Sequence, residues 1–191
     1  AGNDVITNGA GGGTITGGAG DDTITLGAGA ETVVVSGNTA ALTGSDTIAT
    51  FGAEDTLDLS VMTIGALANA VISTAITLAT VIELADQTTS IAFQDEKLMV
   101  VEVANTADVD TVANIVTALT NAGVADAIDP AANIDSYLLI GGADDDTVQY
   151  LYAINNDGTL ALIAGEIALI GTITTDKTGG IAGYITTDFA Y

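Results

Sequence analysis

The sequence predicts a mainly β protein, in which a short parallel β-roll of nonapeptide repeats precedes a strand-rich β-domain with one α-helix. Glycine-rich units repeat at the start of the chain, and apolar runs alternate with polar turns towards its end. The chain is 48% hydrophobic but only 4% aromatic, so its apolar residues are mostly Ala, Val, Ile and Leu, with abundant Thr. This mixture favours strands over helices. We place the roll and its closing segment at residues 1–60 and the strand-rich domain at residues 61–191.

The repeat has a nine-residue period, and its units read AGNDVIT, NGAGGGTIT, GGAGDDTIT and LGAGAETVV. In each unit a turn rich in glycine, which tolerates positive φ angles, precedes a short strand. The inward positions of these strands are predicted to be Ile6, Ile15, Ile24 and Val33. Successive turns of such a coil fall on opposite edges, so the first and third units share an edge. Asp4 and Asp22 are therefore predicted to stack.

The segment NGAGGGTITGGAGDDTITLGAGAET resembles the GGxGxDxUx nonapeptide of RTX proteins, whose stacked turns bind calcium. The segment GSDTIATFGAEDTLDLS, residues 44–60, is similar to the one that closes the roll in many RTX proteins. The final residues, YITTDFAY, are similar to the uncleaved export signals of type I secreted RTX proteins. The resemblance implies the C-terminal part of a secreted bacterial surface protein of the surface-layer or filament kind, located outside the cell or on its surface.

The resemblance also implies a calcium site on the edge that carries Asp4 and Asp22. Calcium prefers oxygen ligands, and glycine-rich turns can present backbone carbonyls without obstruction by side chains. On the opposite edge Gly13 lacks a carboxylate and Glu31 is one methylene longer than Asp, so we expect weaker binding there. The alternative is a solenoid turn held by hydrogen bonds alone. The predicted ligands are Gly2, Asn3, Asp4, Gly18, Gly20, Asp22, Glu31 and Asp46.

Charge and composition exclude several classes of function. Twenty-five acidic residues against two basic ones, Lys97 and Lys177, give a formal charge of -23, which repels nucleic acid and anionic membrane surfaces. Without His or Cys the chain lacks the ligand sets of zinc, copper and haem, and it cannot form a usual catalytic triad. We expect a protein that is not an enzyme and whose metal is hard and oxygen-ligated, with Ca²⁺ as the natural candidate.

Residues 59–82 carry no charge, which raises the question of a membrane span. Asn69, Ser73 and several threonines interrupt the run, and neither Lys nor Arg flanks it, so we interpret it as buried strands. The segments SIAFQ and KLMVVEV, residues 90–94 and 97–103, read as a hairpin.

Residues 108–122 carry apolar side chains at helical spacing, with Asp108 and Asp110 near the start and Gly123 after the end. This pattern predicts a helix. Beyond Pro130, SYLLIGG, VQYLYAI and TLALI alternate with polar turns and predict antiparallel strands. In one of these turns, residues 144–146 are all Asp. We interpret them as solvated hairpin acids, with a secondary calcium site as the alternative.

Two functions fit these features. The first is an extracellular calcium-binding structural protein that assembles with copies of itself into a surface layer or filament, with cell-surface polysaccharide as a further candidate partner. The second is the calcium-triggered folding and type I secretion module of a larger RTX toxin, hydrolase or adhesin. The large region after residue 60 favours the first. Because the first unit is incomplete, we expect a longer precursor or a second subunit to precede it.

Overall fold

The computed structural model describes residues 1–35, 44–61, 97–103, 109–120, 134–142, 147–156, 164–175, 183–184 and 188–190. These residues are mainly β structure, as the composition predicts, with one short α-helix among them. The predicted Asp cluster at residues 144–146, Lys177 and most of the uncharged run at residues 59–82 lie outside the described ranges.

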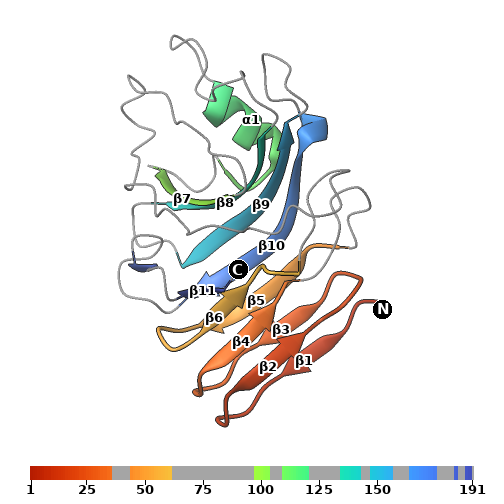
Figure 1. Ribbon diagram of the computed structural model, residues 1–191, viewed down its shortest axis with the longest axis vertical. Coiled ribbons are helices and arrows are strands. Elements are labelled where there is room, and N and C mark those ends of the chain that lie inside the picture. Colours follow the sequence, from red (N-terminus) through yellow and green to blue (C-terminus); the bar gives the residue numbers. More distant parts are fainter. Residues whose placement is uncertain are drawn as a thin grey trace.

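The N-terminal strands form a coil that alternates between two sheets (Figure 1). β1, β3 and β5 pair in parallel in the first sheet, and β2, β4 and β6 pair in parallel in the second. We use the name coil for residues 1–35 and 44–61. Its strands are β1 (Val5–Thr7), β2 (Gly13–Thr16), β3 (Thr23–Thr25), β4 (Glu31–Val34), β5 (Asp46–Phe51) and β6 (Thr56–Asp58).

The register of the coil stacks apolar side chains in two columns. Ile6, Ile24 and Ile48 are partners across the first sheet. Ile15, Val33 and Leu57 are partners across the second. All except the half-buried Ile6, which packs against the core at the open end of the stack, are buried. The predicted inward positions of the repeat are therefore the positions that build this part of the core.

Two later strands continue the coil. β10 (Ile167–Thr175) pairs in parallel with β5, and β11 (Phe189–Ala190) pairs in parallel with β6. Residues 44–60 consequently supply two further rungs of the stack instead of closing it. The closing strands come from much later in the chain, which a local repeat pattern does not reveal.

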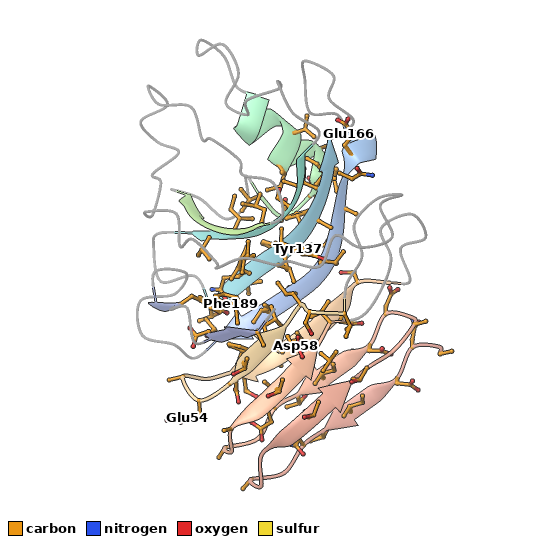
Figure 2. All side chains as sticks on the ribbon, viewed as in Figure 1. Glu54, Asp58, Tyr137, Glu166 and Phe189 are labelled. Atoms are coloured by element: carbon orange, nitrogen blue, oxygen red, sulfur yellow. The ribbon has the colours of Figure 1, made fainter. Side chains whose placement is uncertain are left out.

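The junction between the coil and the later strands is aromatic. The ring of Tyr184 stacks on Phe51, with centroids 5.8 Å apart, and on Phe189, with centroids 5.7 Å apart. The Thr175 hydroxyl donates a hydrogen bond to the Phe51 carbonyl at 2.7 Å. Figure 2 shows Phe189 beside the point where β10 meets the coil. The last described residues of the chain are thus part of the core.

The first sheet extends beyond β10 through β9 (Val148–Asn156), β8 (Ile134–Gly142) and β7 (Lys97–Val103). The pair β9–β8 is antiparallel, as predicted for SYLLIGG and VQYLYAI, and the pair β10–β9 is antiparallel as well. The third predicted strand, TLALI at residues 159–163, lies outside the described residues. β7 pairs in parallel with β8. The first half of the hairpin predicted at residues 90–103 lies outside the described residues. Strands from both sides of the predicted boundary at residue 60 share one sheet and one apolar cluster.

The predicted helix is present as α1 (Val112–Thr120), between β7 and β8 in the chain. It begins four residues later than predicted because Thr111 caps it, its hydroxyl accepting the Asn114 N–H at 3.2 Å. The Ile115 side chain of this helix is buried. Just before the helix, the Val109 carbonyl accepts a hydrogen bond from the Tyr152 hydroxyl at 2.8 Å. Within the described ranges, no helix has the length and apolar character needed to cross a membrane.

Replacing Phe189 by Ala tests whether β11 is integral to the coil. Because the Phe189 side chain is only 5% exposed and stacks on Tyr184, we expect the free energy of unfolding to fall by about 3 to 5 kcal/mol. Phe189→Leu, which keeps most of the buried apolar volume, should cost only about 1 kcal/mol. Urea denaturation measures both losses, and equal, small effects would show that the strand contributes little.

Candidate metal centre

Three aspartates lie on successive rungs at one edge of the coil. Asp4 and Asp22 directly precede β1 and β3, and Asp46 is the first residue of β5. The strand register aligns the three residues. The Asp4 N–H donates to Asp22 Oδ1 at 2.7 Å, and the Asp22 N–H donates to Asp46 Oδ1 at 3.1 Å. We use the name Asp edge for these three residues. The stacking of Asp4 and Asp22 predicted from their spacing is present.

The Asp edge buries two of its three carboxyl groups. Asp22 is 1% exposed and Asp46 is 8% exposed, whereas Asp4 is open to solvent. Among the described residues, Asp22 Oδ2 is buried with no hydrogen-bond partner. Burial raises the pKa of Asp46 to about 6, an effect that the Asp22 N–H opposes and that the charges of Asp22 and Asp21 reinforce. A carboxylate oxygen left unpaired in the interior is costly, and a bound cation would offset that cost.

The unpartnered oxygen of Asp22 faces a glycine. A Cβ atom built on Gly17 would overlap Asp22 Oδ2 and the Asp22 Cγ atom. Gly17 therefore provides the space that the carboxylate occupies inside the turn. The repeat pattern includes Gly17, but the predicted ligand set does not.

The turns of the Asp edge are fastened by a second row of hydrogen bonds on the solvent side. Asn3 Oδ1 accepts the Asp21 N–H at 3.0 Å, and Asp21 Oδ1 accepts the Ser45 N–H at 2.8 Å. The side-chain oxygen of Asn3, a predicted ligand, is thus already used to join two turns. In this row the later turn donates to the earlier one. Along Asp4, Asp22 and Asp46, the earlier turn donates to the later one.

The glycines of the predicted ligand set also lie in these turns. Gly2 and Gly20 occupy equivalent places with φ angles of 102° and 124°, and a Cβ on Gly20 would overlap the Gly2 carbonyl. Gly18, with φ of 103°, lies near the Ala1 nitrogen. The structure therefore brings the glycine and aspartate candidates of the first and third units to one edge of the coil.

Glu31 lies on the opposite edge, where its neighbour across the sheet is Asp55. Glu31 is 1% exposed and Asp55 is 3% exposed. Asp55 is absent from the predicted ligand set, although it belongs to the segment GAED within residues 44–60 that resembles the repeat. The available signal was its place at the start of a strand, since Asp55 directly precedes β6 and Glu31 is the first residue of β4. We use the name Glu edge for Glu31 and Asp55.

The chemistry of both edges suits a hard cation better than a soft one, because the side-chain donors are carboxylates. Within the described ranges, no three or more Asp, Glu, His or Cys side chains converge into a group that could hold a metal ion by themselves. Calcium takes six to eight oxygen ligands, so backbone carbonyls would have to complete its coordination at either edge. The unpartnered buried oxygen of Asp22 fits such an ion.

Comparison of the chain with protein-family models, with curated proteins and with solved structures finds no match.

Replacing Gly17 by Ala tests the packing of Asp22. The added methyl group overlaps the buried carboxylate, so we expect the free energy of unfolding to fall by about 1 to 3 kcal/mol. Gly11→Ala is the matched control, because a Cβ on Gly11 meets no atom within 4 Å. Chemical denaturation compares the two variants, and equal losses would contradict the close packing of Asp22 against residue 17.

Proposed function

We propose that the chain is an extracellular calcium-binding structural protein that assembles with copies of itself into a surface layer or filament. In this proposal the coil is a β-roll of the RTX type and calcium binds at the Asp edge. The observation that carries it is the stacked pair of Asp4 and Asp22, in which Asp22 Oδ2 is buried without a hydrogen-bond partner. The glycine-rich turns around this pair can contribute the remaining oxygen ligands.

The charge of the chain supports a cation as the ligand. A formal charge of -23 concentrates cations near the protein and makes the folded state repel itself. With dissociation constants of roughly 0.1 to 1 mM, typical of extracellular modules, millimolar calcium stabilises the folded chain by about 0.4 to 1.4 kcal/mol per site. Calcium would therefore adjust the stability of the coil modestly at each site.

A structural role is supported by the continuity of the fold. In the described part of the chain, β1, β3 and β5 of the coil lie in one sheet with β10 and β9, so rigidity gained at the Asp edge would extend to these later strands (Figure 1). Without His or Cys the chain cannot form a usual catalytic triad. Secretion, surface location and self-assembly are supported by the resemblance to RTX surface proteins in repeat and composition, and polysaccharide binding remains an expectation.

The Asp22→Asn variant tests the ion. Asparagine keeps an oxygen that can accept the Asp4 N–H but loses the charge that binds calcium. We expect the share of the stabilisation that millimolar calcium provides at the Asp edge, about 0.4 to 1.4 kcal/mol, to disappear from this variant. Thermal unfolding in calcium and in chelator measures the difference.

The matched control for this experiment is Asp21→Asn. Asp21 is the adjacent, solvent-exposed acid, and the substitution removes the same charge while leaving an oxygen for the Ser45 N–H. This control should keep its calcium response. A stability loss in Asp22→Asn that is the same in calcium and in chelator would mean that no ion binds there.

Electron microscopy of the purified chain tests self-assembly. We expect ordered sheets or fibres in millimolar calcium that dissolve when a chelator removes the ion. Particles that stay monodisperse in both conditions would contradict assembly. Combined with a calcium-dependent gain in folded structure, that result would instead favour the folding and secretion module of a larger protein.

A further inference from the structure

We propose that the outer face of the first sheet of the coil binds the surface of ice. This inference goes beyond the proposed function and does not depend on it, because the residues that form the face are uncharged and bind no metal ion. The face belongs to β1, β3, β5 and β10, which pair in parallel in this order (Figure 1). We use the name Thr face for the outward residues of these four strands that the register aligns.

The Thr face consists mostly of threonine. Successive side chains of a strand point to opposite faces, so the residues on either side of the buried Ile24 and Ile48 point outward. The register aligns these outward residues in two columns. The first column contains Val5, Thr23, Thr47 and Thr172, and the second contains Thr7, Thr25 and Ala49. In the first column Thr172 is half-buried and the other residues are exposed to solvent.

The packing beneath the Thr face is uniform. The inner side of the same strands carries one column of identical residues, which contains Ile6, Ile24, Ile48 and Ile173. The same side chain therefore supports every rung. Neighbouring strands lie about 4.8 Å apart, and alternate residues of one strand lie about 6.6 Å apart, so the outward residues form a regular two-dimensional array. Because β-branched side chains have few χ1 rotamers, the threonine hydroxyl and methyl groups keep fixed positions in it.

An array of this kind is suited to ordered water. Oxygen atoms at the surface of ice repeat in two directions at intervals similar to those of the Thr face. A threonine hydroxyl can both donate a hydrogen bond to a water molecule and accept one from it, while the methyl group fits between water molecules. Each contact is weak. Since the residues are held rigidly on one sheet, many contacts can form together at a small cost in side-chain freedom.

The composition of the Thr face argues against other kinds of ligand. Although the chain has 25 acidic residues, the two aligned columns contain no charged residue and no aromatic residue. An ion would require charge, and a sugar ring commonly stacks on an aromatic side chain. A stable protein interface usually has an apolar centre larger than Val5 and Ala49 can supply. Ordered water is the ligand that matches both the chemistry and the spacing.

The second sheet of the coil provides an internal comparison. Its inner column mixes three residue types, Ile15, Val33 and Leu57. One of its outward columns contains Thr16, Val34 and Asp58, so this face carries a charge (Figure 2). Of the two faces of the coil that the structure describes, the first therefore has the uncharged and uniform array.

Uptake of the full chain into growing ice tests the Thr face. We expect the unmodified chain to be incorporated into slowly growing ice and to change the shape of single ice crystals. Thr23→Lys and Thr47→Lys each place a long, charged side chain in the middle of the array. We expect either substitution to reduce the incorporated fraction to that of an inert protein. Circular dichroism reports whether each variant folds, and either one suffices if the other does not.

The matched control is Thr14→Lys. Thr14 is exposed and precedes the inward Ile15 on β2, as Thr23 precedes Ile24 on β3, but it lies on the second sheet. This variant should be incorporated into ice like the unmodified chain. Incorporation that persists in folded Thr23→Lys or Thr47→Lys, or that is lost equally in Thr14→Lys, would overturn the proposal.

The unmodified chain separates this inference from the other possible partners and from the proposed function. Exclusion of the chain from ice would overturn the inference, and it would do so even if the chain bound insoluble crystalline polysaccharide instead. A chain that is excluded from ice but is stabilised by calcium would leave the proposed function in place. A chain that enters ice without any response to calcium would support the Thr face and contradict the metal centre alone.

Discussion

The parallel register of the coil is the constraint on which its other features depend. A strand displaced by one residue would turn Ile24 or Val33 towards solvent, because successive side chains point to opposite faces. Burial of each such side chain contributes about 1.5 to 3 kcal/mol, so the core fixes the register. The same register aligns the acids at the starts of the strands. Hydrophobic packing thus holds acidic side chains close together, although they would repel one another and separate if the register did not fix them.

The backbone compensates for part of this repulsion. The carboxyl groups of Asp22, Asp46 and Asp55 each accept at least one main-chain N–H. Two buried oxygens are left over, Asp22 Oδ2 and Glu31 Oε2, one at each edge of the coil. The turns therefore supply part of the compensation that the buried acids need and leave one oxygen at each edge without it.

Local patterns predicted much of this arrangement. The nine-residue period identified the inward columns and the stacking of Asp4 on Asp22, and apolar spacing identified α1, although the Thr111 cap moved its start. The pairing of Glu31 with Asp55 was not predicted, because these residues are 24 positions apart and break the period of the earlier units. The addition of β10 and β11 to the coil was also missed, since pairing between distant segments leaves no periodic signal in the sequence.

The late origin of β11 has a consequence for how the chain folds. Phe189 pairs with Leu57, and the Thr175 hydroxyl reaches Phe51 across 124 residues of sequence, so the stack closes only after a long loop of chain has been brought together. Loop closure of this kind precedes the contacts that stabilise it, which makes folding slow. Until β11 arrives, the edge of β6 exposes unpaired N–H and C=O groups to any other strand in reach. The order in which the strands are joined is therefore a source of vulnerability that the finished fold conceals.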